Sequence, residues 1–284
     1  MIVGGSKKEV IENIKKNTLS LELNKKVEID DPFLSDDEIN TLLNNFFKNK
    51  KNILYKIKKR EANKIVKKVR KELGEIEITG LKSIEGLDLS KGAIVTSNHF
   101  NPLDSYAIRE LATKLNKKLY IVIEDTNLAL PGVIGFLMNN LDVLPVSKSP
   151  NYLIKTFNNE LKKILSDGNL VLIYPEEEMW FNYAKPRPCK RGAYQFATQN
   201  NVPIISCFTE IIDLGISDNE EFNKVKYNVH VLKPLFPDKE KTVKQNSIDM
   251  AKKDYEQKKE AYEKAYSKKL TYDFDYKDII GLKN

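Results

Sequence analysis

Residues 93–104 read AIVTSNHFNPLD and contain the pattern that decides the fold. The apolar run that opens this stretch predicts a short buried strand, and Pro102 suits the first turn of a helix that follows it. His99 therefore lies at the exit of a strand, and Asp104 lies in the next helical turn, where the two side chains can meet. A carboxylate bonded to one imidazole nitrogen fixes the tautomer and leaves the other nitrogen free to accept a proton.

The chain has two histidines, so nearly all candidate imidazole chemistry falls on His99. His230 lies in the alternating pattern YNVHVL, which predicts a half-buried strand residue with no chemical role. Taken alone, the His99–Asp104 spacing also suits a satisfied core histidine beside an aspartate that caps a helix.

Further segments follow His99 in a fixed order. The apolar run LVLIY ends in Pro175-Glu176, KRGA opens a helical stretch, and NVPII begins another strand. This series resembles the glycerolipid acyltransferase family, which includes the lysophosphatidic acid acyltransferases. That family shows an NHx4D block, a block with a basic residue near a strand end, an F-P-E-G-type block and a V-P-I-type block. The similarity spans residues 75 to 235, about the middle of the chain.

The resemblance implies an O-acyltransferase that moves a fatty acyl group from acyl-CoA or acyl carrier protein to a hydroxyl of a lysophospholipid-like acceptor. 1-Acylglycerol-3-phosphate is the default acceptor; a glycolipid or an envelope-polymer intermediate is an alternative, as is a membrane-surface lipid-binding protein without turnover. His99 takes the role of general base and Asp104 orients it, with the backbone at residues 97–100 as a source of oxyanion donors. No metal and no cofactor beyond the acyl donor are expected. The substrate-binding residues expected from the motif positions are Asn98, Lys148, Pro175 and Glu176.

The block after Pro175 departs from the family pattern. Glu177 and Glu178 follow Glu176 where the family has a glycine and, further on, a Thr-Arg pair. The loop WFNYAKPRPCKR just downstream supplies replacement charges that are expected to hold an anionic headgroup or the phosphates of a pantetheine donor. Its aromatic residues, Trp180 and Tyr183, are expected to stack on a sugar or to line an acyl channel; the alternative is a solvated basic loop. The basic residues in question are Lys185, Arg187, Lys190 and Arg191.

The net charge of +7 is concentrated near the N-terminus, because residues 48–71 carry a dozen Lys and Arg against the single acid Glu61. Apolar residues recur in this segment at four-residue steps, which predicts an amphipathic helix with a basic face. Such a helix either binds an anionic membrane surface or packs on the catalytic domain. Nucleic-acid binding is not expected, because no RNP, zinc-finger or helix-turn-helix signature accompanies the charge.

The resemblance implies a role in phospholipid biosynthesis, and the expected location is cytoplasmic, peripheral on the inner face of the cell membrane. No run of about 18 apolar residues indicates a membrane span, and the N-terminus lacks the apolar core of a signal peptide. The two cysteines fit a reducing compartment. Serine-hydrolase, dinucleotide-binding and Walker motifs are absent from the sequence. One histidine beside three successive acids is a poor set of metal ligands, and Cys207, in an apolar strand, is an unpromising nucleophile.

Strands and helices alternate from residue 76 to residue 232, which predicts an α/β fold with a mixed, largely parallel sheet covered by helices on both faces. Residues 1–74 are expected to form a helical, basic N-terminal region and residues 75–284 the acyltransferase α/β domain. The expected strands are residues 76–79, 93–97, 119–124, 142–146, 170–174, 204–208 and 227–232. The expected helices from residue 103 onward are residues 103–115, 131–140, 152–165, 191–199 and 247–267.

Overall fold

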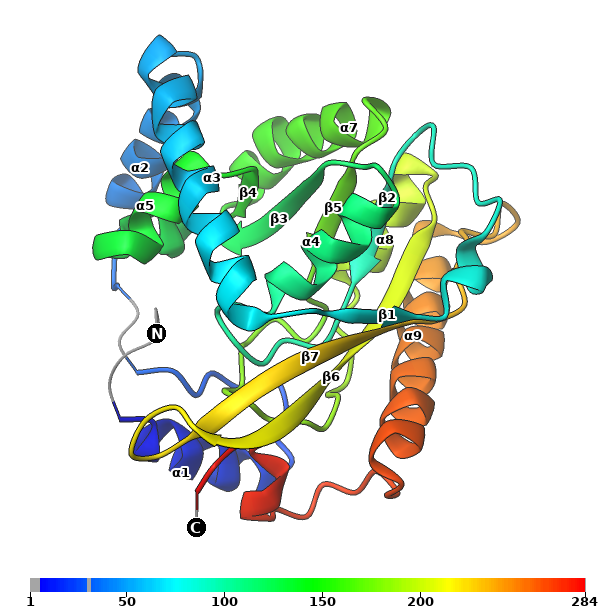
Figure 1. Cartoon of the computed structure of the whole chain (residues 1–284). Helices are drawn as coiled ribbons and strands as arrows, with labels where there is room; N and C mark the ends of the chain where they lie inside the picture. The colour runs from blue at the N-terminus through cyan, green and yellow to red at the C-terminus, as the bar shows by residue number, and fades with distance from the viewer. Residues whose placement is uncertain (1–5, 30–31, 284) are drawn as a thin grey trace.

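The computed structural model describes residues 6–29 and 32–283, and its centre is a seven-stranded sheet in the order β1-β7-β6-β2-β5-β3-β4 (Figure 1). The five strands from β6 to β4 are parallel, β7 runs antiparallel to β6, and β1 pairs parallel with β7. The mixed, largely parallel sheet predicted from the sequence is therefore confirmed. The strands are β1 (Glu77–Thr79), β2 (Ala93–Thr96), β3 (Leu119–Glu124), β4 (Val143–Val146), β5 (Leu170–Ile173), β6 (Ile204–Ser217) and β7 (Asn223–Val231).

Helices cover both faces of this sheet (Figure 1). One face carries α4, which packs against β3, β5 and β7, and the other carries α7, α8 and α9. The helices are α1 (Lys8–Leu19), α2 (Asp36–Lys50), α3 (Ile53–Leu73), α4 (Ser105–Lys114), α5 (Gly132–Asn140), α6 (Pro150–Tyr152), α7 (Asn158–Ser166), α8 (Gly192–Asn200) and α9 (Val243–Tyr266), with a π-helical turn at Leu153–Phe157 between α6 and α7.

The parallel strands in the middle of the sheet form the centre of the core. Every residue of β2 is buried, and so are the first three residues of β5. Strands covered on both faces need apolar side chains on both sides, which is why these segments read as continuous apolar runs. Gly92 precedes β2 with φ +67°, and a Cβ there would lie 2.2 Å from the carbonyl oxygen of Asn169, so the position requires glycine.

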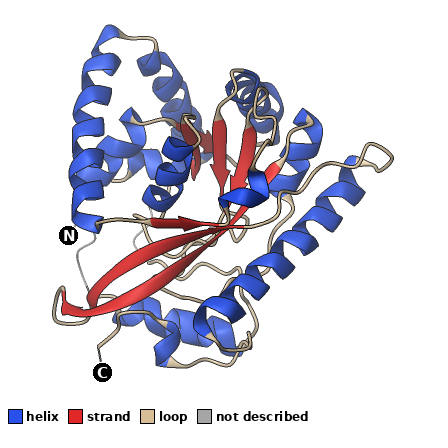
Figure 2. Ribbon diagram, turned by 45° about the vertical axis from the view of Figure 1, so that its right-hand side comes forward, coloured by secondary structure: helices blue, strands red, loops and turns tan. Residues whose placement is uncertain are grey.

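The β6–β7 hairpin extends well beyond the parallel sheet (Figure 2). The apolar run in the sequence predicts a strand over residues 204–208, whereas β6 continues to Ser217. Its last five residues are exposed, and in this part β6 pairs only with β7. The strand is longer than predicted because its distal half is largely solvated and its apolar residues are interrupted by Asp213 and Gly215, so no continuous apolar run marks it.

The helices before β1 form two separate units. The α2–α3 helical hairpin stands at the β4 end of the sheet, and α1 lies near the β6–β7 hairpin (Figure 1). α2 begins at a capping box formed by Ser35 and Glu38, and α3 ends at Gly74, whose φ is +73°. Among the described residues, no helix combines the length and apolarity needed to cross a membrane.

Candidate active site

His99 and Asp104 meet at the carboxyl end of β2, as their spacing predicts. His99 Nδ1 lies 2.8 Å from Asp104 Oδ2, and the same carboxylate oxygen accepts backbone N–H bonds from Phe100 (2.9 Å) and Asn101 (3.2 Å). The Asp104 side chain is 3% exposed and that of His99 is 21% exposed. Within the described residues, His99 Nε2 has no hydrogen-bond partner. One ring nitrogen is thus held by a buried carboxylate, and the other is free to exchange a proton with a bound molecule.

Tyr174, directly after β5, contacts both His99 and Asp104. Its hydroxyl donates to Asp104 Oδ1 at 2.5 Å, and its ring stacks on the His99 imidazole with centroids 3.9 Å apart and planes 9° apart. Burial, together with the nearby Asp104 carboxylate, raises the pKa of Tyr174 well above its ordinary value, so the phenol stays a neutral donor. The sequence placed Tyr174 at the end of a strand, as the first residue of the block that resembles F-P-E-G, and assigned it no role of its own. The signal that was available is an aromatic residue immediately before the Pro-Glu block.

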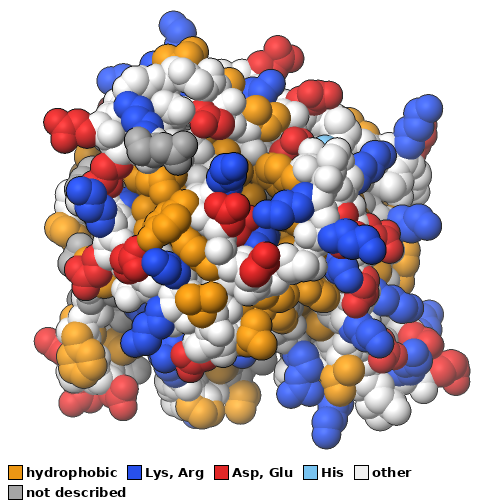
Figure 3. Space-filling model, turned by 90° about the horizontal axis from the view of Figure 1, so that it is seen from below, with side chains coloured by type: hydrophobic (Ala, Val, Ile, Leu, Met, Phe, Trp, Pro, Cys, Tyr) orange, Lys and Arg blue, Asp and Glu red, His pale blue; other side chains and the backbone are white. Residues whose placement is uncertain are grey.

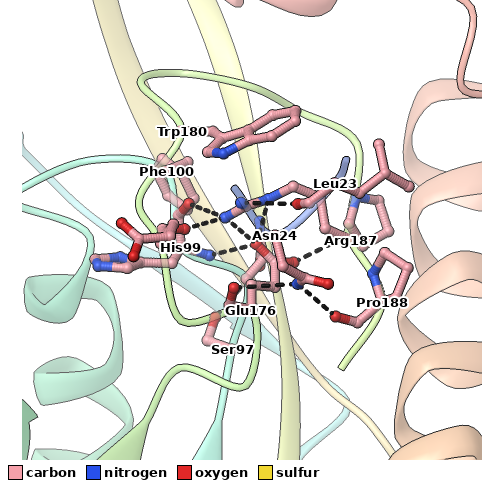
Figure 4. Close-up of polar contacts among 12 residues, drawn as sticks. Leu23, Asn24, Ser97, His99, Phe100, Glu176, Trp180, Arg187 and Pro188 are labelled. Atoms are coloured by element: carbon pink, nitrogen blue, oxygen red, sulfur yellow. Dashed lines mark hydrogen bonds and ion pairs between the residues drawn. The ribbon is translucent and has the colours of Figure 1, made fainter. Parts of the chain in front are cut away.

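Glu176 and Arg187 form a buried ion pair against the backbone of His99 (Figure 4). Glu176 Oε2 lies 2.8 Å from one terminal nitrogen of Arg187 and 3.0 Å from its Nε, while Glu176 Oε1 accepts the backbone N–H of Arg187 at 2.9 Å. Glu176 Oε2 also accepts the His99 N–H, and Arg187 donates to the His99 carbonyl, both at 3.2 Å. The pair therefore binds both polar backbone groups of the candidate base.

These contacts occupy two of the amides expected to stabilise an oxyanion. The His99 N–H donates to Glu176 and the Phe100 N–H donates to Asp104. Both acceptors are carboxylates, and bonds to charged acceptors are the stronger ones. In this arrangement the two N–H groups hold the loop in place and do not point at a reacting oxygen, which differs from the sequence-based expectation.

Two distant segments brace the loop that contains Arg187. From the N-terminal side, the Asn24 side chain donates to the carbonyls of Glu176 (3.2 Å) and Pro188 (2.9 Å), and Lys25 accepts the Trp180 indole N–H at 2.9 Å. From the C-terminal end, residues 272–282 contribute further contacts, including a β-bridge between Ile279 and the loop. Sequence reasoning missed both segments, since neither contains a motif.

Comparison with known proteins identifies the central part of the chain. Residues 75–210 match the family model described as Acyltransferase. These residues form an acyltransferase-family domain. The chain is accordingly an enzyme of acyl transfer, in agreement with the resemblance seen in the sequence.

One solved structure similar to the chain is that of the 1-acyl-sn-glycerophosphate (LPA) acyltransferase PlsC from Thermotoga maritima. The two are 16% identical over 82% of this chain and 90% of that chain, with a TM-score of 0.46. No curated protein matches the sequence.

Two of the four basic residues expected to bind an anion in this acyltransferase are buried and already paired. Lys185 Nζ lies 2.6 Å from Asp278, and Arg187 is bonded to Glu176. Both side chains are fully buried. The expectation of free charge at these two positions is therefore corrected, because acids that sequence inspection did not connect with the loop neutralise them.

The two aromatic residues of the same loop also lie inside the protein. Trp180 is 0% exposed and Tyr183 is 2% exposed, and both belong to a second apolar cluster that includes residues of α1. The Arg187 guanidinium lies 4.6 Å from the centroid of the Trp180 ring. These buried rings stabilise the fold of the acyltransferase domain. The expectation that they stack on a sugar is therefore wrong, because neither ring is exposed.

The other predicted substrate-binding residues divide into two groups. Lys148, Lys190 and Arg191 are exposed, and Lys148 follows β4 at the carboxyl end of the sheet. Asn98 and Pro175 are buried. The Asn98 amide exchanges two hydrogen bonds with the backbone of Thr209, at 3.0 and 2.8 Å, so it joins the β2 loop to β6.

Neither a cysteine nucleophile nor a metal site competes with His99 as the centre of the chemistry in the described residues. Burial raises the pKa of the Cys189 and Cys207 thiols to about 12 each, so neither is a thiolate at neutral pH. Across residues 6–29 and 32–283, no group of three or more His, Cys, Asp or Glu side chains is arranged to hold a metal ion.

Proposed function

We propose that the chain transfers a fatty acyl group from a thioester, acyl-CoA or acyl carrier protein, to a hydroxyl of a lysophospholipid-like acceptor. His99 Nε2 removes the proton from the acceptor hydroxyl as it attacks the thioester carbonyl, and later returns that proton to the leaving thiolate. Asp104 keeps Nδ1 protonated and stabilises the imidazolium that forms. No covalent acyl-enzyme is required when donor and acceptor bind together.

The observation that carries this proposal is the arrangement of the imidazole. Its Nδ1 is fixed by a carboxylate at 2.8 Å, whereas its Nε2 is unpartnered among the described residues on a side chain that is 21% exposed. A satisfied core histidine bonds through both nitrogens or is fully buried. His99 bonds through one nitrogen and is partly exposed, as expected of a general base that exchanges protons with a bound substrate.

The test compares the two histidines of the chain. His99→Ala should lower kcat for acyl transfer by about 10²- to 10⁴-fold, the usual contribution of a general base, and leave vesicle binding unchanged. His230→Ala is the matched control, because His230 bonds Glu210 (2.9 Å) and Thr79 (3.1 Å) through its two ring nitrogens. Full transfer by the His99 variant would exclude the proposed base.

A different acceptor is the second candidate, and one observation favours it. Glu176, which the family resemblance assigns to the polar acceptor, is 1% exposed and all its polar contacts are to protein groups. The acceptor is therefore recognised by other residues, and a glycolipid or envelope-polymer intermediate fits as well as a lysophospholipid. Incubating the protein with labelled acyl-CoA and a panel of such acceptors, followed by mass spectrometry of the products, distinguishes them.

We also propose that the α2–α3 hairpin holds the protein at an anionic membrane surface on the cytoplasmic side. Its tip is suited to this: Ile53, Leu54 and Ile57 are 68%, 55% and 53% exposed, and four exposed Lys residues lie among them, at positions 48, 51, 56 and 58. Exposed apolar side chains among lysines are typical of an interfacial anchor.

The rest of the hairpin and the molecule's lower face differ from this tip. Further along α3, Ala62 and Val69 are buried and Ile65 and Val66 pack on the core. The face seen from below mixes basic, acidic and hydrophobic side chains (Figure 3). We therefore assign membrane binding to the start of α3 and packing on the catalytic domain to the rest of it.

A further inference from the structure

Arg109 is a half-buried cation with no hydrogen-bond or ion-pair partner among the described residues. It lies on α4, five residues after Asp104, and within the described part of the chain its guanidinium makes no hydrogen bond and no ion pair. The groups that act most on its charge are the Tyr106 phenol, the Asp142 carboxylate and the Tyr174 phenol. Asp142 is already bonded to Lys59 at 2.6 Å and to Lys118 at 3.0 Å, so its charge is satisfied elsewhere.

A second unmet donor lies beside Arg109 on the same helix. Tyr106, one turn earlier, is 6% exposed, and its hydroxyl oxygen is buried without a hydrogen-bond partner. Residues three apart on a helix are neighbours on its surface. Buried donors without acceptors are costly, and an unpaired buried cation is more costly still. Two such groups side by side point to an anion that is bound during function.

The position of Arg109 connects this feature to the catalytic pair. Tyr174, one of its electrostatic partners, stacks on the His99 ring and bonds Asp104. The buried cations of the site loop, Lys185 and Arg187, are already neutralised by Asp278 and Glu176. A substrate anion that reaches the Tyr174 side of the dyad therefore finds Arg109 with its five donors unused.

We propose that Arg109 binds a phosphate group of a substrate beside the His99–Asp104 pair. This inference deepens the proposed function and rests on it: the phosphate belongs either to the headgroup of the acceptor or to the phosphopantetheine arm of the donor. A planar guanidinium binds phosphate through two parallel N–H bonds, which also fixes the orientation of the ligand. Bound in this way, the phosphate positions the reacting hydroxyl or thioester at His99 Nε2.

The experiment uses the full chain with Arg109→Gln and Arg109→Lys. The matched control is Arg70→Gln, which removes an exposed guanidinium that is already paired with Glu110 on α4. KM is measured for lysophosphatidic acid and for monoacylglycerol, which lacks the phosphate, and for acyl-CoA and an acyl-N-acetylcysteamine thioester, which lacks the phosphopantetheine. Binding of inorganic phosphate to each protein is measured separately by calorimetry.

If the acceptor supplies the phosphate, Arg109→Gln should raise KM for lysophosphatidic acid by roughly 10- to 100-fold, as for a lost hydrogen bond to a charged group, and leave monoacylglycerol unchanged. If the donor supplies it, KM should rise for acyl-CoA alone among the donors. Arg109→Lys should retain part of the binding, because it keeps the charge and loses the fork. Unchanged KM values and unchanged phosphate binding in Arg109→Gln would overturn the proposal.

The phosphate titration separates this proposal from the proposed function. A wild-type protein that binds phosphate through Arg109 but transfers no acyl group would refute the transferase proposal and preserve the site. If the wild-type protein transfers acyl groups and Arg109→Gln behaves like Arg70→Gln, the transferase proposal stands and the phosphate site at Arg109 is refuted.

Discussion

At the scale of single residues, the site is defined by how completely Asp104 is held. One of its oxygens accepts from two backbone N–H groups and contacts His99, and the other accepts from the Tyr174 hydroxyl. A carboxylate bonded in this way cannot rotate, so the imidazole it contacts is also fixed. Groups that orient a catalytic side chain contribute as much to the reaction as its own chemistry, because misplacement of the base weakens every later step.

Replacement of Tyr174 tests this directly. Tyr174→Phe keeps the ring on His99 and removes the hydroxyl, so it leaves Asp104 Oδ1 as a buried acceptor without its donor. We expect kcat to fall about tenfold or more, since an unsatisfied buried group costs about 1–3 kcal/mol, with KM little changed.

Tyr174→Leu is the companion variant, since it removes the stacked ring as well as the hydroxyl. It should be less active than Tyr174→Phe at every pH. Equal kcat values for Tyr174→Phe and the wild type would show that the hydroxyl has no positioning role.

Lys50 at the end of α2 gives a second residue-scale prediction, concerning stability. Burial lowers its pKa to about 8, although its ammonium donates to the Val143 carbonyl at 2.9 Å. The unfolded chain keeps this lysine protonated up to its ordinary pKa of 10.5. Between pH 8 and 10.5 the unfolded state therefore binds more protons, so the Lys50 contribution to stability rises with pH, and its burial penalty is fully present at pH 7.

Lys50→Met should accordingly stabilise the protein at pH 7 by about 1–2 kcal/mol, less than the full shift implies because the lysine is partly solvated and loses its hydrogen bond. Thermal melts of the two proteins at pH 7 and at pH 10 measure the difference. The difference in stability between Lys50→Met and the wild type should be smaller at pH 10 than at pH 7. A larger difference at pH 10 would contradict the argument that burial lowers the pKa of Lys50.

At the scale of elements, the sequence predicts what its apolar patterns mark and misses what tertiary contacts create. Strands β2 and β5 were found because they are buried on both faces and read as continuous apolar runs, whereas buried and half-buried residues alternate along β3. The distal half of β6 was missed because it is solvated. The Glu176–Arg187 pair was missed because the ten residues of loop between the partners hide a contact that only the folded chain forms.

The stripe of apolar residues on α3 shows the same limit within one helix. A stripe at helical spacing indicates a buried face without saying what buries it. The core takes Ala62 and Val69, whereas Ile53 and Ile57 extend past the edge of the sheet and stay exposed. Deleting residues 48–73 would therefore remove part of the core together with the tip, so point substitutions are the better test of membrane binding.

The variant Ile53→Ser/Leu54→Ser/Ile57→Ser should lose most flotation with anionic liposomes and keep its thermal stability. Each apolar side chain inserted into the interface is worth about 1.5–3 kcal/mol when fully buried, so losing three outweighs the remaining attraction of the lysines. Ile154→Ser is the control, because Ile154 is also 68% exposed but lies on the turn between α6 and α7. Equal flotation of the triple variant and the wild type would remove the tip as an anchor.

At the scale of the whole molecule, the acyltransferase-family domain is completed by segments that lie outside its matched residues. The apolar cluster beneath the site joins residues of α1, the loop around Trp180 and residue Ile279 near the C-terminus. A division of the chain at residue 74 stays a prediction, but α1 packs across that point onto the site. The family match alone therefore does not contain all the residues that hold His99 in place.

Asn24 allows this dependence to be measured, because it alone supplies the two side-chain amide bonds, to Glu176 and Pro188, that brace both ends of the site loop. Asn24→Ala should lower kcat several-fold, since the Glu176–Arg187 pair that holds the His99 backbone then loses its outer support. Asn13→Ala is the matched control: Asn13 also makes an amide bond to a backbone carbonyl, that of Val27, but inside the N-terminal segment. Both variants should lose about 1 kcal/mol of stability for each lost hydrogen bond. If the N-terminal segment only stabilises the fold, the two will lose activity in proportion to stability; a loss of kcat confined to Asn24→Ala shows that a segment about 75 residues before the catalytic histidine positions it.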